Sequence, residues 1–388
     1  MRVTHVITSL DVGGAETMLW KLLSRLQGER FECEVICLGT MGEIGKRIAA
    51  LGVPVHAMGL SRTFPNPFAV FSLARSIRKF RPDVVQTWMN HANLLGTVAC
   101  AIAGEGPLVW SLRQANLDAA VNRRRTLWIA RACAKLSDRA SAIVLCSEAS
   151  RQPHVEFGYP TDKMQVIPNG FDTDAFRPDS EARYEFRREL GIAGDTPIVG
   201  LIARFDSQKD QHTFIRAASE IARRRPDTRF LLCGTDITWQ NRALAGWIDD
   251  AGIRESCVLL GRRDDVPRVM AALDMLASSS CGEGFPNVIG EAMACGVPCV
   301  VTDVGESAAI VDSTGRVVPP HDAQGLAKAC LQVLEMSSDD RRDLGHRARS
   351  RIMNHFSLDA VVAAYIRLYG SVAGGSHVLA TEMVAGKD

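Results

Sequence analysis

Strand-like and helix-like runs alternate along nearly the whole chain, and this feature limits the possible folds more than any other. Short runs rich in Val, Ile and Leu, such as Val84–Trp88 and Ile198–Ile202, are each followed by a longer run with helical spacing. Strands that alternate with helices form parallel sheets with crossover helices. The sequence therefore predicts an α/β protein built on doubly wound parallel sheets.

The length of the chain predicts two domains. A chain of 388 residues is longer than a single hydrophobic core readily serves. We expect an N-terminal domain over residues 1–170, a C-terminal domain over residues 190–354 and a hinge within residues 169–197. A helix predicted at residues 181–190 lies between the two halves. Residues 371–388 lack a core-forming pattern and are expected to be disordered.

Composition and cysteine usage exclude several classes of protein. The eleven cysteines are scattered, often inside apolar runs, which is typical of buried thiols in a reducing compartment. No spacing of Cys and His suggests a metal site. The N-terminus reads as a strand rather than a signal peptide, and the uncharged stretch Val84–Gly104 is interrupted by polar residues, so no spanning helix is expected. We expect a cytoplasmic protein without a nucleic-acid partner.

Charge is distributed unevenly along the chain. Residues 1–170 hold 20 Lys and Arg against 13 Asp and Glu, whereas the rest is net acidic and the whole chain has a charge of +1. The densest basic run lies within residues 123–135, where Arg124, Trp128, Arg131 and Lys135 share one side of a predicted helix. Cations beside a tryptophan are typical of a helix at an anionic membrane surface. A solvated helix face has the same pattern, and both interpretations remain open.

Two glutamates, Glu283 and Glu291, flank a predicted helix start. The segment that contains them follows a strand-like run and leads into a helix-like run that ends before Pro298. Pro286 suits the first turn of a helix, where its missing N–H breaks no bond. The free N–H groups of that turn attract anions. Carboxylates on both sides of a phosphate-ready helix start favour a nucleotide-diphosphate sugar as the ligand.

The same segment resembles the Glu-x7-Glu motif of the retaining glycosyltransferases of family 4, which have the GT-B fold. Further stretches resemble motifs of this family in the same order: Gly13-Gly14-Ala15-Glu16, Pro168-Asn169-Gly170-Phe171-Asp172, Ala203-Arg204-Phe205 through Lys209, Gly261 through Val266, and Val318-Pro319-Pro320. The resemblance covers about residues 1–370. It implies two Rossmann-like domains that face each other across a cleft, with a C-terminal helix at residues 355–370 that packs back on the first domain.

The resemblance also implies roles for the donor-side residues. Arg204 and Lys209, just after the strand Ile198–Ile202, would hold the diphosphate as it departs. Glu283 would contact the hydroxyls of the donor sugar, and Glu291 those of the ribose. The other donor contacts implied are Gly13, Gly14, Gly284, Phe285, Pro286, Asn287 and Val288, with Arg262 and Val266 against the base. Structural alternatives are a solvated Arg204–Lys209 pair, a helix cap for Glu283, an ion pair for Glu291 and an exposed turn for Arg262.

Two residues of the first domain are candidates for the acceptor side. His91 and Arg113 follow strands of the first domain, on the acceptor side. Many family members carry a histidine where this chain has Arg113; an arginine cannot shuttle protons but can bind a phosphate or an anionic acceptor. His91 could instead belong to the core or cap a helix. Glu306 stands where the family often has glycine, so the family's donor contacts at that position are not assigned to this chain. Asp172-Thr173-Asp174 matches the family's linker rather than a metal-binding motif.

These patterns predict a retaining glycosyltransferase that moves a hexose or N-acetylhexosamine from a UDP-linked donor to a glycan or lipid-linked acceptor in the synthesis of a cell-surface polysaccharide or glycolipid. No cofactor or metal is expected beyond the donor itself, and an anionic membrane could be a peripheral partner. The alternatives are a nucleotide-sugar epimerase of the same fold and a non-catalytic module that binds nucleotide sugars or glycans. Sugar interconversion without acceptor would indicate the first, and binding without turnover the second. The absence of a GxGxxG fingerprint disfavours a nicotinamide dehydrogenase.

Overall fold

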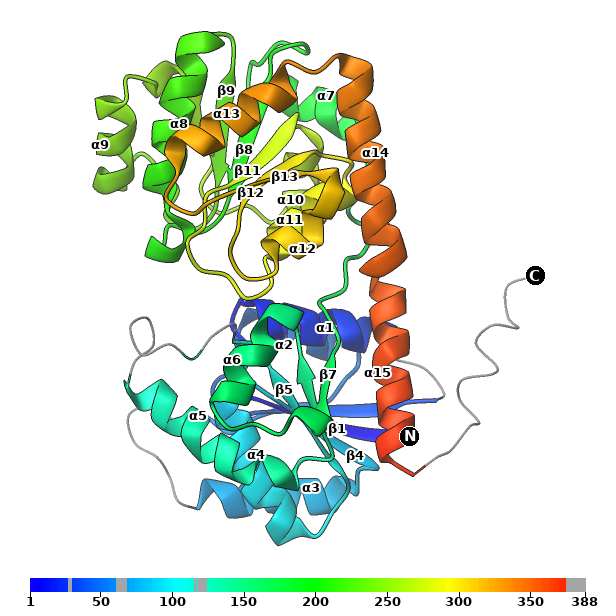
Figure 1. The fold of residues 1–388 in the computed structure, drawn as a ribbon. Helices are drawn as coiled ribbons and strands as arrows, with labels where there is room; N and C mark the ends of the chain where they lie inside the picture. Colours follow the sequence, from blue (N-terminus) through cyan, green and yellow to red (C-terminus); the bar gives the residue numbers. More distant parts are fainter. Residues whose placement is uncertain (27–29, 61–67, 115–116, 118–123, 375–388) are drawn as a thin grey trace, which may run out of the picture. The chain divides into compact units, whose positions relative to one another are not determined.

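A computed structural model describes the chain over residues 1–26, 30–60, 68–114, 117 and 124–374. The chain forms two compact units: unit 1 comprises residues 1–170 and 358–388, and unit 2 comprises residues 171–357. Each unit has its own parallel sheet with a hydrophobic core on both faces (Figure 1). The predicted α/β class with doubly wound parallel sheets is confirmed.

The sheet of unit 1 has seven strands within the described residues, all parallel, in the order β3-β2-β1-β4-β5-β6-β7. Their bounds are β1 Arg2–Ile7, β2 Glu32–Cys37, β3 Val55–Ala57, β4 Val84–Trp88, β5 Leu108–Leu112, β6 Ala142–Leu145 and β7 Met164–Val166. Every residue of β4 and β5 is buried, as expected for strands covered on both faces. The strand order changes direction between β1 and β4, and loops meet at the carboxyl edge there.

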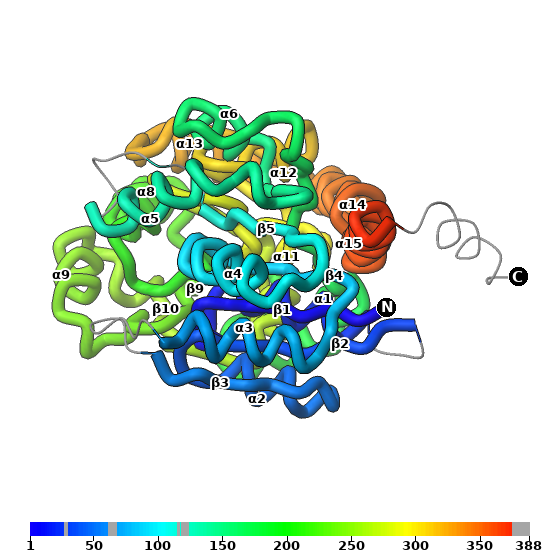
Figure 2. The backbone as a smooth tube through the Cα atoms, turned by 90° about the horizontal axis from the view of Figure 1, so that it is seen from below, coloured from blue at the N-terminus to red at the C-terminus, as the bar shows by residue number. Residues whose placement is uncertain are grey.

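Helices cover both faces of this sheet. One face carries α1 Gly14–Leu26, α2 Gly42–Ala50 and α15 Leu358–Val372, which share a core with Val3, Ile7 and Trp88. The other face carries α3 Ala69–Phe80, α4 Asn90–Ala103, α5 Arg124–Leu136 and α6 Arg151–Glu156, which pack on Val6, Val85 and Trp110 (Figure 2). Short 3-10 helices are η1 Ser137–Arg139, η2 Glu148–Ser150 and η3 Thr161–Lys163. Alternate residues of each strand thus serve alternate cores.

Helix α15 lies far along the chain from the rest of unit 1, and two tyrosines hold it in place. Tyr365 and Tyr369 are fully buried. The Tyr365 hydroxyl accepts a hydrogen bond from Arg113 Nη2 (2.6 Å), and the Tyr369 hydroxyl donates to Gln86 Oε1. The helix extends to Val372. Residues 375–388 lie outside the described residues, so disorder in the tail stays a prediction.

Unit 2 has a six-stranded sheet within the described residues, again all parallel, in the order β10-β9-β8-β11-β12-β13. The strands are β8 Ile198–Ile202, β9 Arg229–Cys233, β10 Cys257–Leu259, β11 Met275–Ser278, β12 Cys299–Thr302 and β13 Arg316–Val318. One face packs against α8 Gln211–Arg224, α9 Arg242–Asp250 and α13 Ala323–Leu334. The other packs against α7 Ser180–Glu189, α10 Val266–Ala271, α11 Asn287–Ala294, α12 Ser307–Val311 and α14 Ser338–His355. Its 3-10 helices are η4 Ser207–Lys209, η5 Arg254–Ser256 and η6 Asp312–Thr314.

Residues 171–189, which the sequence leaves between the two domains, form part of unit 2. Helix α7 buries Phe186 completely in the core of that unit. Arg183 and Arg187 each donate to a different oxygen of the Asp274 carboxylate at 2.6 Å. A fully buried aromatic side chain and two ion pairs bind this helix to the sheet, which is why it does not act as a free linker.

The cysteines are reduced, and almost all of them are buried. All eleven cysteines are free thiols, and each is buried except the half-buried Cys281. Burial raises the pKa of Cys330 to about 12, so such thiols stay protonated. Among the residues that the structure describes, no helix is both long and apolar enough to cross a bilayer.

Candidate active site

The carboxyl edge of the unit 2 sheet brings together the loops that follow β8 and β11, which are neighbouring strands. Ligands of open α/β sheets bind at this edge. Hydrogen bonds join the two loops directly. Ser279 Oγ donates to the carbonyl oxygens of Lys209 (3.0 Å) and Asp210 (2.9 Å), and the Cys281 N–H donates to Gln208 O (2.8 Å). The loops therefore hold their side chains in one defined site.

Arg204 lies just beyond β8 and is the more exposed of the two cations predicted to bind phosphate. Its side chain is 61% exposed, and its Nε donates to Asp206 Oδ2 at 3.1 Å. Burial alone would raise the pKa of Asp206, but the Gln208 N–H and the charges of Arg204 and Lys209 outweigh burial and lower that pKa. The guanidinium keeps solvent-facing donors, so it can bind an anion without leaving its ion pair.

Lys209 and Glu283 form the centre of the site. Lys209 Nζ lies 2.5 Å from Glu283 Oε1, and the two side chains are only 17% and 10% exposed. Ser280 Oγ donates to the same carboxylate oxygen at 2.7 Å. Ion pairs held away from water need additional hydrogen bonds to be stable, and Ser280 supplies one here. The structure thus brings together two predicted site residues that lie 74 positions apart in the sequence.

A second pair lies beside Lys209. Asp210 has a left-handed backbone (φ 45°) and caps α8 by accepting from the Thr213 N–H. Its Oδ2 also contacts His321 Nδ1 at 2.8 Å. His321, on the loop after β13, has a φ of 61°. Such backbone angles are uncommon in non-glycine residues, and Asp and His adopt them more often than most. The hydrogen bonds to Asp210 therefore fix the backbone that carries Lys209.

The backbone of Glu283 and Gly284 is itself enclosed. The Glu306 N–H donates to Gly284 O at 3.2 Å. Gly305 has a φ of 54°, and a Cβ atom there would lie 2.4 Å from Glu283 O. The segment in which this chain departs from the family pattern thus packs directly against the loop that carries Glu283. A side chain at position 305 would displace that loop.

Helix α11 begins directly after this loop, with Pro286 at its N-cap and Asn287 as its first residue. Glu291 is half-buried in the second turn. Phe285 stacks on Phe171, with ring centroids 6.1 Å apart. A Cβ at Gly290 would lie 2.1 Å from the Phe171 ring. Packing therefore requires glycine at position 290, the second of the two glycines within the Glu-x7-Glu segment.

Arg262 and Val266 lie after β10, at the same edge of the sheet. Arg262 Nη2 is 3.7 Å from Asp264 Oδ1, and its side chain is 49% exposed. Val266 is the first residue of α10 and packs against the core of unit 2. Both positions are accessible from the edge where the predicted base would lie, and their roles remain predictions.

In unit 1, the predicted glycine pair forms the turn between β1 and α1. The Thr17 N–H donates to Gly13 O (2.9 Å), and α1 begins at Gly14. A Cβ at Gly13 would lie 2.3 Å from Glu16 Oε2, and Ser9 Oγ donates to Glu16 Oε1 at 3.2 Å. The carboxylate of Glu16 thus occupies the space beside Gly13.

The two acceptor-side candidates of unit 1 differ in their surroundings. His91 is an exposed residue in the first turn of α4, next to Met89, whose φ is 71°. Arg113 donates to Ser111 Oγ (2.8 Å), Asn169 Oδ1 (2.7 Å) and Tyr365 OH (2.6 Å). Its guanidinium also lies 4.7 Å from the Trp88 ring centroid. These contacts make Arg113 a link between β5 and α15, whereas the side chain of His91 is exposed.

Sequence reasoning missed Ser280, Asp210 and His321. The first belongs to the polar run Ser278-Ser279-Ser280 at the end of a buried strand, a position where side chains often reach a ligand. The other two touch only because β13 and β8 return to the same edge. No local sequence pattern predicts that contact.

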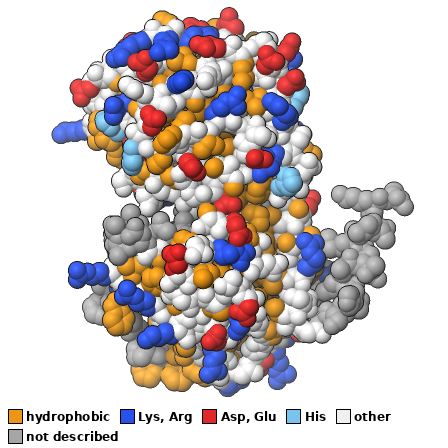
Figure 3. Space-filling model, in the orientation of Figure 1, with side chains coloured by type: hydrophobic (Ala, Val, Ile, Leu, Met, Phe, Trp, Pro, Cys, Tyr) orange, Lys and Arg blue, Asp and Glu red, His pale blue; other side chains and the backbone are white. Residues whose placement is uncertain are grey.

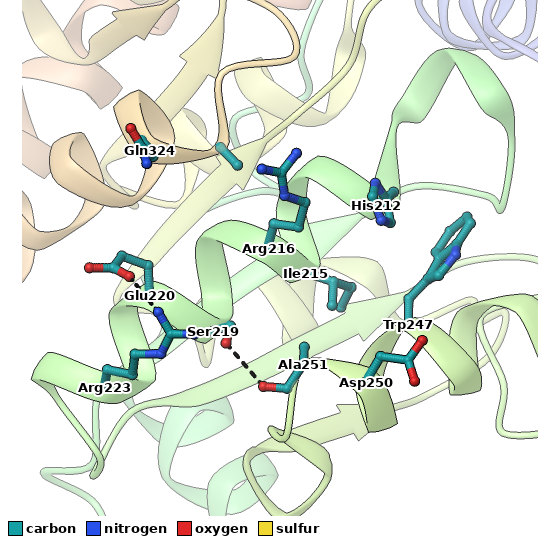
Figure 4. A pocket seen from close by; sticks show the side chains of 11 residues that line it. His212, Ile215, Arg216, Ser219, Glu220, Arg223, Trp247, Asp250, Ala251 and Gln324 are labelled. Carbon is teal, nitrogen blue, oxygen red and sulfur yellow. Dashed lines mark hydrogen bonds and ion pairs between the residues drawn. The ribbon is translucent and has the colours of Figure 1, made fainter.

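The predicted donor residues lie away from the pocket on the surface of unit 2. A pocket of about 360 Å³ lies between α8 and α9 and includes Arg216, Glu220 and Trp247, but none of the predicted donor residues lines it (Figure 4). Among the residues that the structure describes, no group of three His, Cys, Asp or Glu side chains is placed to hold a metal ion. The carboxyl edge of unit 2 remains the best-supported site.

Comparison with known proteins agrees with this geometry. Residues 12–175 match the family model described as Glycosyltransferase Family 4, and residues 196–336 match that described as Glycosyl transferases group 1. The UDP-Gal:alpha-D-GlcNAc-diphosphoundecaprenol alpha-1,3-galactosyltransferase of Escherichia coli is 24% identical over 92% of this chain and 94% of its own length. A GDP-mannose-dependent alpha-(1-6)-phosphatidylinositol monomannoside mannosyltransferase of Mycolicibacterium smegmatis is 27% identical over 82% of each chain.

Solved structures show the same fold. The structure of Anabaena Alr3699/HepE in complex with UDP superposes with a TM-score of 0.84 at 24% identity, covering 96% of this chain and 100% of that one. Sucrose-phosphate synthase from Thermosynechococcus elongatus superposes with a TM-score of 0.82 at 19% identity, covering 97% and 100%. With both family models matched in order and both sheets arranged as in these structures, the chain belongs to glycosyltransferase family 4 and has the GT-B fold.

Proposed function

We propose that this glycosyltransferase is a retaining enzyme that moves a hexose or N-acetylhexosamine from a UDP-linked donor to a glycan or lipid-linked acceptor in the synthesis of a cell-surface polysaccharide or glycolipid. The observation that carries the proposal is the ion pair between Lys209 and Glu283, 2.5 Å apart at the carboxyl edge of the unit 2 sheet. A cation suited to phosphate and a carboxylate suited to sugar hydroxyls lie side by side there.

The proposed reaction is a displacement on one face of the sugar. The bond between the anomeric carbon and the β-phosphate oxygen breaks, and the acceptor hydroxyl oxygen bonds to that carbon. The proton of the acceptor hydroxyl passes to the departing phosphate, so UDP leaves with it. Arg204 and Lys209 neutralise the charge that develops on the phosphate.

The position of α11, directly after the loop that carries Glu283, supports the proposed contacts with the ribose and the phosphate. Glu291 binds the ribose hydroxyls. The backbone N–H groups of Phe285, Asn287 and Val288 contact the sugar and the phosphate. Arg262 and Val266 lie against the base, and Gly13 and Gly14 of unit 1 let the backbone approach the donor. The E. coli relative is named for UDP-galactose, and the HepE complexes contain UDP or UDP-glucose, which favours uracil as the base.

The acceptor binds unit 1, near His91. The E. coli relative is named for a diphosphoundecaprenol-linked acceptor and the M. smegmatis relative for a phosphatidylinositol mannoside, which favours an acceptor on a lipid carrier. The enzyme would work in the cytoplasm, at the inner face of the membrane. No metal ion is required, because Arg204 and Lys209 supply the positive charge that the departing diphosphate needs.

A thermal-shift screen tests the donor class directly. UDP-, GDP-, ADP- and TDP-sugars are compared in buffer containing EDTA. A ligand that binds only the folded protein raises the apparent Tm, so UDP-sugars should raise Tm more than the other three classes. A larger shift with a different base would overturn the choice of uracil, and a shift that appears only with added divalent cations would overturn metal independence. The anomeric configuration of the product, measured by NMR, tests retention.

A further inference from the structure

Three helices of unit 1 expose an unusual set of apolar side chains. Helix α4 contacts both α3 and α5, and the three form one layer over the sheet (Figures 1 and 2). Of the large hydrophobic side chains that are exposed among the described residues, more than half belong to this layer. They are Phe68 (73% exposed, directly before α3), Phe71 (58%), Val98 (40%), Ile102 (38%) and Trp128 (73%). Apolar side chains concentrated on one face indicate an interaction surface.

The charges of the same layer are all of one sign. The described residues 69–80, 90–103 and 124–136 contain no Asp or Glu. Their charged residues are Arg75, Arg78, Lys79, Arg124, Arg125, Arg131 and Lys135, and all of these are exposed. Figure 3 shows basic side chains beside hydrophobic ones over α5. Acidic residues lie just beyond the ends of these helices and on the next elements: Asp83 after α3, Glu105 after α4, Asp138 in η1, Glu148 in η2 and Glu156 in α6. Arg123 of the predicted basic run lies outside the described residues.

A second arginine run shows that this arrangement is not a general property of the surface. On α8 of unit 2, Arg223 and Arg224 both pair with Glu220, at 3.0 and 3.6 Å (Figure 4 shows the first pair). Arg124 and Arg125, by contrast, have no carboxylate within ion-pair distance among the described residues. The positive charge on α5 is uncompensated, so it can attract an anionic surface.

We propose that the layer formed by α3, α4 and α5 is the surface by which this protein docks on a membrane that contains anionic lipids. Cations near such a surface each contribute about 1 kcal/mol, and aromatic side chains prefer the headgroup region. The aliphatic side chains of Val98 and Ile102 distinguish a bilayer from a nucleic acid, because bases stack on aromatic rather than aliphatic groups. The proposal rests on the proposed function, in which the acceptor is carried on a lipid.

The direction of the helices connects this surface to the acceptor site. In a parallel sheet the helices run opposite to the strands, so the first turns of α4 and α5 lie at the carboxyl edge of the unit 1 sheet. His91 occupies the first turn of α4, and Trp128 lies near the start of α5. A bilayer held against this layer would therefore lie close to the edge that bears the acceptor candidate.

Vesicle sedimentation tests the docking surface with two matched pairs of variants. Vesicles of phosphatidylglycerol mixed with phosphatidylcholine are compared with phosphatidylcholine alone, at low and high sodium chloride. We expect the wild type to sediment with the anionic vesicles at low salt, and R124Q/R125Q to bind them at least about tenfold more weakly. The control R223Q/R224Q removes the same charge from unit 2 and should bind as the wild type does. Trp128→Ala should weaken binding, whereas Tyr184→Ala, which removes another exposed aromatic side chain, should not.

Several outcomes would overturn the proposal. One is an equal loss of vesicle binding in R124Q/R125Q and R223Q/R224Q. The others are vesicle binding that does not depend on salt or on phosphatidylglycerol, and no vesicle binding by the wild type. Loss of binding to an RNA oligonucleotide without loss of vesicle binding in R124Q/R125Q would assign the face to nucleic acid instead. UDP affinity, measured by calorimetry on the same proteins, separates the two proposals: intact UDP binding without vesicle binding removes only the docking surface, whereas absent UDP binding removes the proposed function.

Discussion

Lys209 and Glu283, 74 positions apart in the sequence, meet with Nζ and Oε1 at 2.5 Å on two loops that are hydrogen-bonded to each other. Both side chains are mostly buried, whereas neighbouring Arg204 is mostly exposed. This difference predicts that the two cations, which have the same proposed role in catalysis, have different roles in stability.

Substitution of each cation separates these roles. Lys209→Ala and Arg204→Ala should each lower kcat by about 10²–10³-fold, because removal of one preorganised electrostatic contact typically costs about 2.7–4 kcal/mol in the barrier. Lys209→Ala should also lower Tm, since it leaves the Glu283 carboxylate buried without its cation; Arg204→Ala should leave Tm nearly unchanged. Steady-state kinetics and thermal denaturation measure both effects. Wild-type turnover in both variants would remove the diphosphate assignment.

Elements with strong local patterns could be predicted from the sequence, and contacts between distant segments could not. The buried strands β4 and β8 have the predicted bounds because each is a short apolar run followed by a helix. Strand β13 is missed, since it has three residues and Val317 is 41% exposed. The positions of Lys209 and Glu283 could be predicted because each residue lies in the loop that follows a strand. The contact of Asp210 with His321, and that of Arg113 with Tyr365, depend on how separate strands and helices pack.

Gly290 should tolerate no side chain. An added Cβ would lie 2.1 Å from the buried Phe171 ring, so Gly290→Ala must shift α11 or the ring, and overpacking of this kind typically costs about 1–3 kcal/mol. Gly246→Ala is the matched control. It also lies within a helix, but no atom lies within 4 Å of its added Cβ, and alanine is favoured over glycine in helices by up to about 1 kcal/mol. Urea denaturation should therefore show opposite signs for the two changes; equal signs would contradict the packing of α11 on Phe171.

Buried His5 should make the stability of the protein depend on pH. Burial lowers the pKa of His5 from 6.5 to about 3, and its Nδ1 accepts a hydrogen bond from Trp88 Nε1 at 3.3 Å. Between these two pH values the unfolded chain binds a proton that the folded chain does not, so the free energy of unfolding falls as pH falls from 6.5 toward 3. The slope from this group is at most about 1.4 kcal/mol per pH unit.

His5→Gln isolates that contribution, because glutamine can still accept from Trp88 but does not titrate. Urea denaturation is measured for both proteins at several pH values below and above 6.5. The free energy of unfolding should fall less steeply with decreasing pH in the variant than in the wild type. If the free energy of unfolding has the same slope against pH in both proteins, folding does not lower the pKa of His5.

Calorimetric titration of UDP into the wild type, Glu291→Ala and Glu283→Ala tests the proposed division of the donor site most directly. If Glu291 holds the ribose, Glu291→Ala should weaken UDP, because UDP contains that ribose. If Glu283 contacts the transferred sugar, Glu283→Ala should leave UDP affinity nearly unchanged while turnover collapses. Equal loss of UDP affinity in both variants would contradict this division, and unchanged affinity in both would contradict the placement of the donor at this edge of unit 2.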